Sequence, residues 1–235
     1  GDAKAATCVS CHTAHSILPA SDTRSLVHAL KVPETCDTCH GDDDYMAGYG
    51  LERDVFTKYA TSVHGVALLE EGDVGAPACN DCHGNHGALP PEVSSLSQVC
   101  GTCHLNNQEL FDGSVMASAF EEDQLHACME CHSHHDIEHS TDDMVGIGDE
   151  SICMDCHAEG DAGFAVADTM YRHLAALVAI SDSASSLRQT VATIGMDDVD
   201  IEYLLLDAHQ SLIESRTLVH GFDVALVRDE TQEGV

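Results

Sequence analysis

Aromatic residues are scarce in this chain, and tryptophan is absent. The 235 residues include five tyrosines and five phenylalanines, so aromatic residues make up only 4% of the sequence. A conventional core for a chain of this length would bury more aromatic area. Either the fold is extended, or something other than aromatic side chains fills its interior. The 12 cysteines and 17 histidines far exceed an ordinary share and indicate metal or cofactor chemistry.

Basic residues are also few. Nine lysines and arginines oppose 41 aspartates and glutamates, which gives a formal net charge of −32. Such a chain repels phosphate backbones and anionic membrane surfaces, so we expect no nucleic-acid partner. The charge favours basic partners, mineral cations or bound divalent ions such as calcium. A soluble, strongly hydrated surface is the alternative meaning of the same charge.

Long apolar runs are missing as well. The longest, from Leu174 to Ile180, is far shorter than the ~20 residues that a membrane-spanning helix needs. We therefore expect no membrane span. No apolar leader follows the first residues, which is typical of a mature, trimmed chain.

Every cysteine belongs to a Cys-x-x-Cys-His pentad. The cysteine pairs are Cys8 and Cys11, Cys36 and Cys39, Cys79 and Cys82, Cys100 and Cys103, Cys128 and Cys131, and Cys153 and Cys156. The histidines that follow them are His12, His40, His83, His104, His132 and His157. Two thiols at this spacing can add to the two vinyl groups of one haem, and the next histidine then faces the iron. The pattern predicts six covalently attached haems c.

Other uses of paired cysteines explain the pattern less well. Six Cys-x-x-Cys pairs could form three zinc sites of four cysteines each, but zinc does not require a histidine after every second cysteine. A disulfide scaffold gives no reason for the histidines either. Redox pairs of the thioredoxin type need a surrounding βαβ pattern, which is absent.

The pentads form three pairs along the chain. The first pentad of each pair is followed, three residues after its own histidine, by a further histidine, and the second pentad is not. These recurring histidines are His15, His86 and His135. Residues 1–160 therefore predict three two-haem units, which we place at residues 1–60, 61–120 and 121–160.

This paired pattern resembles the doubled-CxxCH multihaem cytochromes c, a group similar to the small class III cytochromes and to extracellular cytochromes that polymerise into conducting filaments. The resemblance covers roughly residues 1–160. It implies export before haem attachment, iron held by two histidines, closely stacked haems, and a mostly α and irregular fold with little β structure.

Six haems with two histidine ligands each need six distal histidines. We expect the recurring histidine of each unit to ligate the second haem of its own pair; an exposed loop histidine is the alternative. His64 resembles the family's upstream ligand for the first haem of a pair. His28, between the first two pentads, and His126, which could serve a neighbouring pair, complete the expected set. His139, His173 and His220 are further candidates, and His134 and His139 could instead lie beside the ligands or between haems.

Residues 161–235 contain no cysteine and have a helical period. One apolar stripe runs from Met170 to Ile194, and a second runs from Ile201 to Leu226. Gly195 is a natural helix stop, and Asp197 or Asp198 a natural cap for the next helix. These features predict an antiparallel helical hairpin, which either stabilises the haem region as a cap or forms a subunit contact.

Two histidines on each iron leave no open position for a substrate, so the sequence favours electron transfer over catalysis. The rival class, a multihaem oxidoreductase with one open haem, would show a lysine in place of a pentad histidine or a shortage of histidines, and neither is seen. Two modes of electron transfer stay open: a polymeric filament at the cell exterior, and a monomeric shuttle in the periplasm or at the cell surface. Redox proteins or extracellular acceptors would be the partners.

Overall fold

A computed structural model describes residues 5–86, 96–196 and 198–235. The fold is 64% helical, and no strand occurs in these ranges, which confirms the mostly-α part of the expected fold. The chain divides into two compact units. The N-terminal unit comprises residues 1–100 and 127–139, and the C-terminal unit comprises residues 101–126 and 140–235.

The N-terminal unit consists of short helical segments joined by irregular loops. They are α1 (Cys8–His12), η1 (Ala29–Lys31), α2 (Val32–His40), α3 (Asp43–Met46), α4 (Val55–Thr61), α5 (Val63–Gly65), the π-helical turn η2 (Val66–Glu70), α6 (Cys79–His83), the 3₁₀ segment η3 (Leu96–Thr102) and α9 (Cys128–His132). Most of them span only one or two turns.

The segment that contains α9 belongs to the N-terminal unit although 26 residues of the other unit precede it, residues 101–126. The backbone N–H of Val63, at the start of α5, donates a 2.9 Å hydrogen bond to the carbonyl of Ile137. This bond joins the chain just after the fifth pentad to the α5 region.

The apolar core of the N-terminal unit is small. Its buried cluster consists of Val32, Leu68 and Ala78, and the partly buried residues around it include Tyr59 and two pentad cysteines. The Tyr59 hydroxyl donates a 2.8 Å hydrogen bond to the carbonyl of Pro77 and so holds α4 against the segment before α6. Three small or medium side chains are a minor core for a unit of this length.

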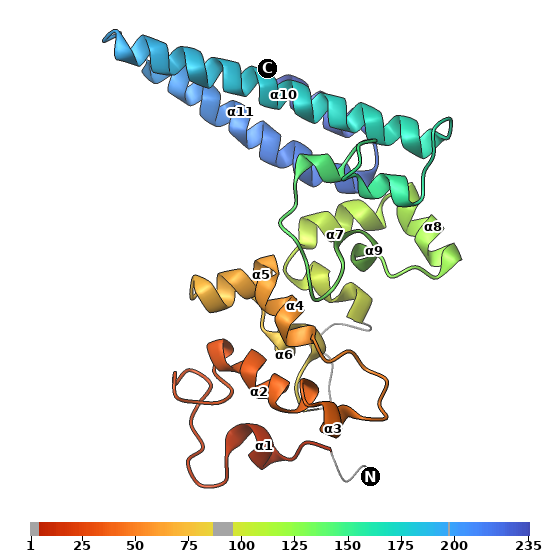
Figure 1. Ribbon diagram of the computed structural model, residues 1–235. Coiled ribbons are helices and arrows are strands. Elements are labelled where there is room, and N and C mark those ends of the chain that lie inside the picture. Colours follow the sequence, from red (N-terminus) through yellow and green to blue (C-terminus); the bar gives the residue numbers. More distant parts are fainter. Residues whose placement is uncertain (1–4, 87–95, 197) are drawn as a thin grey trace. The chain divides into compact units, whose positions relative to one another are not determined.

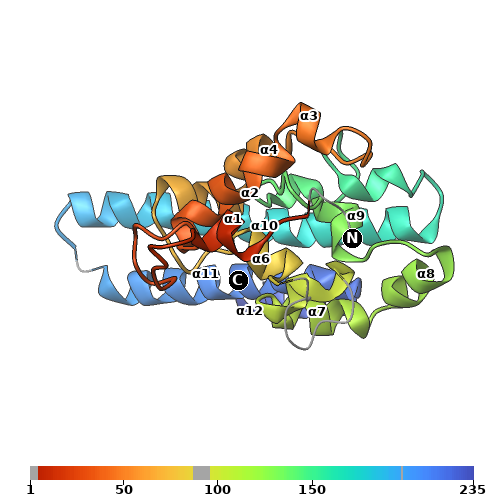
Figure 2. The same ribbon diagram turned by 90° about the horizontal axis from the view of Figure 1, so that it is seen from below.

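The C-terminal unit contains the long helices. Its elements are α7 (Leu105–Asp112), α8 (Val115–Asp123), η4 (Asp142–Met144), η5 (Ile152–Asp155), α10 (Ala162–Thr193), α11 (Val199–Leu218), η6 (Val219–Gly221) and α12 (Val224–Glu233). Helices α10 and α11 lie side by side in both views of the molecule (Figures 1 and 2). The helix pair predicted on either side of Gly195 is therefore present.

One continuous cluster forms the core of this helical part. It consists of Met170, Leu174 and Leu177 from α10, Ala208 and Leu212 from α11, and Val227 from α12. A second apolar contact lies in the same unit, where the ring of Phe111 in α7 meets those of Phe120 and Phe222 edge-on, at 5.6 and 6.4 Å between centres. No helix in the described residues is both long and apolar enough to cross a membrane.

One detail of the predicted hairpin was wrong. The second helix does not run through to Leu226: it ends at Leu218, and Phe222 adopts a left-handed conformation (φ 51°) that starts the separate helix α12. The first stripe is buried only at its inner end, because Ile180, Leu187 and Ile194 are exposed. Asp198 is the residue before α11, as one of the two alternatives had it, while Asp197 lies outside the described residues.

Candidate haem sites

The first pentad of each pair, here called an odd pentad, forms a helix of its own. Helices α1, α6 and α9 each begin at the first cysteine and end at the histidine of one odd pentad. Cysteines three residues apart lie on one face of a helical turn, and the histidine one position later lies close to that face. The three odd pentads therefore have the same local structure, as a three-fold repeat requires.

The second pentad of each pair is built differently. The pentad from Cys36 to His40 forms the last turns of the longer helix α2. Cys100 lies in the 3₁₀ segment η3, and the pentad that starts at Cys153 falls mostly in η5. The alternation of two pentad structures follows the pairing that the sequence shows.

The residue after each odd pentad has an unusual backbone conformation. Thr13, Gly84 and Ser133 have φ values of 62°, 74° and 61° and ψ values within about 20° of 180°. This region of backbone space is populated almost only by glycine, so threonine and serine are strained there. The turn bends the chain immediately before the recurring histidine, which lies two residues further on.

Two pairs of neighbouring imidazole rings each join one two-haem unit to the next. The ring of His12 lies 6.1 Å from that of His86, with 16° between their planes, and the ring of His83 lies 5.9 Å from that of His135, with 29° between the planes. Each pair joins the histidine of an odd pentad to the recurring histidine of the next unit. This differs from the expected arrangement, in which the recurring histidine serves its own unit.

The spacing of these rings fits an iron atom between them. A metal–nitrogen bond of about 2 Å on each side, with about 1 Å from each nitrogen to its ring centre, separates the two ring centres by about 6 Å. The Nδ1 atom of His135 is buried without a hydrogen-bond partner. A buried imidazole nitrogen that makes no hydrogen bond is uncommon, and metal binding is one way to satisfy an imidazole in such a site.

Burial favours the neutral form of His83 and His135. Burial lowers the pKa of His83, and the nearby His40 and His134 lower it further. Burial likewise lowers the pKa of His135, with additional effects of His134 and His83. A neutral imidazole is the form that binds a metal.

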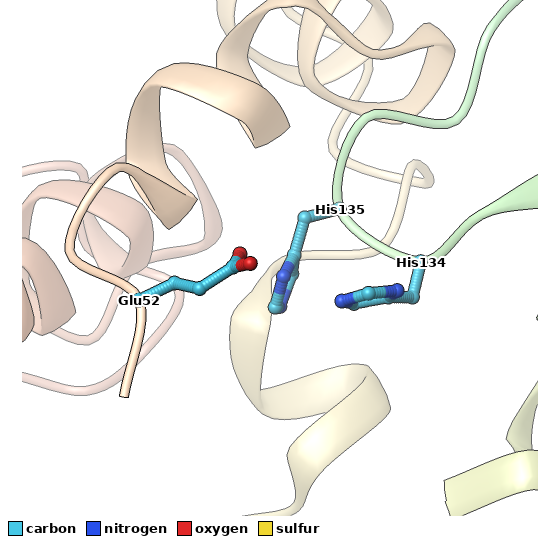
Figure 3. A group of neighbouring side chains, drawn as sticks. All are labelled: Glu52, His134 and His135. Atoms are coloured by element: carbon cyan, nitrogen blue, oxygen red, sulfur yellow. The ribbon is translucent and has the colours of Figure 1, made fainter. Parts of the chain in front are cut away.

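Glu52 lies next to His135 and His134 (Figure 3). Its carboxylate and one ligand atom each of His134 and His135 lie within 4.8 Å of one another. A carboxylate beside a ligating imidazole orients the ring and increases its basicity. Sequence reasoning missed Glu52, because many acidic residues occur near the pentads and none stands out by position.

The cysteines of successive units also come together. The thiol of Cys79 donates a hydrogen bond to the sulfur of Cys36, and the thiol of Cys128 donates one to the sulfur of Cys100, while all twelve cysteines are free. Each contact joins the first cysteine of an even pentad to the first cysteine of the next odd pentad. Haems attached to these cysteines would lie close to one another in space.

No group of three or more ligand atoms among the described residues that lie close enough together to hold one metal ion includes a cysteine. Among the described residues, which include every cysteine, the only group of three or more ligand atoms close enough to hold one metal ion is Glu52, His134 and His135. A structural zinc site requires four sulfur or nitrogen ligands in one place. The pairwise cysteine contacts therefore do not support the zinc alternative.

The remaining expected ligands have varied surroundings. His15 and His126 are exposed, and His64 lies half-buried in α5. His28 is buried, and its Nδ1 accepts a 3.3 Å hydrogen bond from the Leu30 N–H, which leaves Nε2 as its ligand atom. The Nδ1 of His220 lies 2.9 Å from the Thr217 carbonyl oxygen, and its Nε2 lies 3.5 Å from the side-chain nitrogen of Asn107. Both of its ring nitrogens therefore have hydrogen-bond partners.

A glycine positions the histidine of the sixth pentad. A side chain at Gly163, near the start of α10, would place its first carbon 2.1 Å from the ring of His157. Only glycine lets α10 begin against this imidazole, whose Nδ1 also lies 3.4 Å from the carboxylate of Asp161. No pattern in the sequence marks this glycine.

No protein-family model, curated protein or solved structure matches the chain. The assignment of a function therefore depends on the residues and geometry described above.

Proposed function

We propose that this protein binds six haems c through its six pentads and transfers electrons between them. The observation that carries the proposal is the pair of histidine contacts, His12 with His86 and His83 with His135, at the separation that an iron between two imidazoles requires. Haem attachment also explains why the pentad-rich unit has so small an apolar core, because porphyrin rings would fill it.

The two contacts define a rule for the first haem of each unit. Its pentad histidine and the recurring histidine of the following unit would hold the iron. His12 and His86, whose rings lie together, would serve the first haem, and His83 and His135 would serve the third. We propose that His28, His64 and His126 supply further distal ligands.

His15 is the recurring histidine of the first unit, and its side chain is exposed. The extracellular cytochromes that the paired pentads resemble polymerise into conducting filaments. We propose that His15 of one copy ligates a haem of the next, so that copies join end to end as a filament.

The chain's own residues then set the chemistry. The cysteines would anchor each porphyrin, and paired imidazoles would hold each iron, which would leave no open position for a substrate molecule. When bound, the haems supply reversible one-electron oxidation and reduction of iron. The acidic surface favours the more positive ferric state and lowers the reduction potentials. Glu52, beside His135, adds negative charge close to one of the six sites.

A filament would require export of the chain and would lie at the cell exterior. A monomeric shuttle would lie in the periplasm or at the cell surface. Redox proteins or extracellular acceptors would exchange electrons with either form. An oxidoreductase with one open haem is the rival class, and it predicts that one iron is high-spin.

The first experiment is expression of the full chain with the machinery for covalent haem attachment. We expect the intact mass to increase by six haems and the optical spectrum to show low-spin iron only. An unmodified mass with bound zinc would overturn the proposal. A high-spin fraction of about one sixth would favour the oxidoreductase over a pure electron carrier.

Electron microscopy of the haem-loaded protein tests the filament separately. We expect threads with a regular repeat from the wild type and single particles from His15→Ala, with a high-spin signal from one haem in that variant. The matched control is His209→Ala, at an exposed histidine of α11. Single particles from the wild type, with all six irons low-spin, would identify a monomeric shuttle.

A further inference from the structure

The third two-haem unit has an additional histidine at a position where the other two units have none. The residue before the recurring histidine is Ala14 in the first unit, Asn85 in the second and His134 in the third. Only the third unit therefore has two adjacent imidazoles after its odd pentad. The contact of His83 with His135 involves one of the two and leaves the other without an assigned role.

The two adjacent imidazoles lie next to each other in space. The ring centres of His134 and His135 are 4.6 Å apart, with 60° between the ring planes, and Figure 3 shows the two rings side by side. His134 also lies close enough to His83 to contribute to the lowered pKa of that imidazole. Both histidines are therefore near the pentad histidine that we assign to the third haem.

The chain around the two histidines is an irregular bend that is held on both sides. The Ser133 hydroxyl donates a hydrogen bond to the Asp136 carboxylate across the bend, and the carbonyl of Ile137 accepts the 2.9 Å hydrogen bond from the Val63 N–H. The side chain of His134 is exposed. A change of rotamer moves an exposed imidazole by several ångströms, which is the scale of the separation between the two rings.

One carboxylate lies within reach of both imidazoles. A carboxylate oxygen of Glu52 and one ring nitrogen each of His134 and His135 lie within 4.8 Å of one another. An ion pair with Lys58 at 2.8 Å holds the Glu52 side chain in place. A ligating imidazole normally donates its second N–H to a carboxylate, carbonyl or water. Glu52 can accept that N–H from whichever of the two rings binds the iron.

We infer that His134 is an alternative distal ligand of the third haem, so that an iron held by His83 and His135 can exchange His135 for His134. The exchange breaks one iron–nitrogen bond and forms another, and it transfers no electron. This inference rests on the proposed function, because it assumes that the ring pair of His83 and His135 holds the third haem. The first haem has no such alternative beside His86, because residue 85 is asparagine.

Removal of one distal histidine at a time from the haem-loaded full chain tests the inference. We expect His86→Ala to convert one haem to the high-spin form, which binds carbon monoxide after reduction. We expect His135→Ala to keep all six haems low-spin and to bind no carbon monoxide. Added imidazole should return His86→Ala to the low-spin form, which distinguishes an open iron from a misfolded site. Intact mass should show six haems in both variants.

A double variant identifies the replacing ligand. His134→Ala with His135→Ala should have one high-spin haem. The matched control is His135→Ala with His139→Ala, which removes the other exposed histidine of the same segment and should stay low-spin. A double variant at 134 and 135 that stays low-spin while His86→Ala is high-spin would overturn the inference.

Two further outcomes separate the inference from the proposed function. High-spin iron in both His86→Ala and His135→Ala would overturn the inference and leave the ring pairs of the proposed function intact. Low-spin iron alone in all of these variants, the double variants included, would overturn the assigned ring pairs and the inference together.

Discussion

The pentad-rich N-terminal unit and the helical part of the C-terminal unit are held together in different ways. The N-terminal unit has a buried cluster of three residues and many short helices, whereas α10, α11 and α12 share a cluster of six buried residues. Ordering a residue costs roughly 1–2 kcal/mol of backbone entropy, which only extensive burial offsets. The comparison teaches that the helices have enough apolar packing to fold on, whereas the N-terminal unit has a much smaller apolar core, which the proposed haems would supplement.

Preventing haem attachment should sharpen this comparison most. In protein made without the attachment machinery, we expect the N-terminal unit to lose its protection from hydrogen exchange, because its apolar core is too small to fold alone. The inner halves of α10 and α11 should stay protected. Hydrogen exchange resolved by mass spectrometry measures both regions in one sample. Equal protection of the two units in the apoprotein would contradict the comparison.

Truncating a side chain in the helical core should destabilise the helical part of the C-terminal unit and leave the N-terminal unit unaffected. Leu177 is 0% exposed, and Leu177→Ala should lower the free energy of unfolding of the helical part by about 2–5 kcal/mol while leaving the haem spectrum unchanged. Thermal unfolding followed by circular dichroism measures the loss. Leu105→Ala, at an exposed leucine, should change stability by less than about 0.5 kcal/mol, and a comparable loss there would count against the assigned core.

The repeated turn after each odd pentad allows a comparison inside the N-terminal unit. Thr13→Gly should stabilise the haem-loaded protein by about 1 kcal/mol or more, because glycine adopts this backbone conformation without strain. Gly84→Thr, the reverse change at the equivalent position, should destabilise it by a similar amount. Denaturant unfolding measures both. Shifts of the same sign in the two variants would show that the turns are not equivalent.

The smallest expected effect concerns the field at one haem. Glu52→Gln removes a negative charge next to His135, and less negative charge favours the ferrous state. We therefore expect one of the six reduction potentials to rise while the other five change little. Spectroelectrochemical titration measures this, with Glu71→Gln as a control at an exposed carboxylate. A uniform shift of all six, or none, would exclude a local role for Glu52.

Much of the fold followed from pattern. The pairing of pentads was read from the recurring histidines alone and did not predict that odd and even pentads differ in secondary structure, whereas the helical period anticipated α10 and α11. The period could not show that α12 breaks away at Phe222, because the apolar spacing continues across the turn. It also could not distinguish the buried Leu177 from the exposed Leu187, because both occupy the same stripe.

The candidate site was predictable in its members but not in its connections. The sequence by itself determined the six pentads, the recurring histidines and the acidic charge, because these depend only on residue type and spacing. Only the tertiary structure decided that His86 meets His12 and that His135 meets His83, Glu52 and His134. The physical reason is that spacing along a chain constrains contacts within a turn or a helix. Which repeat faces which depends on the path of loops tens of residues long.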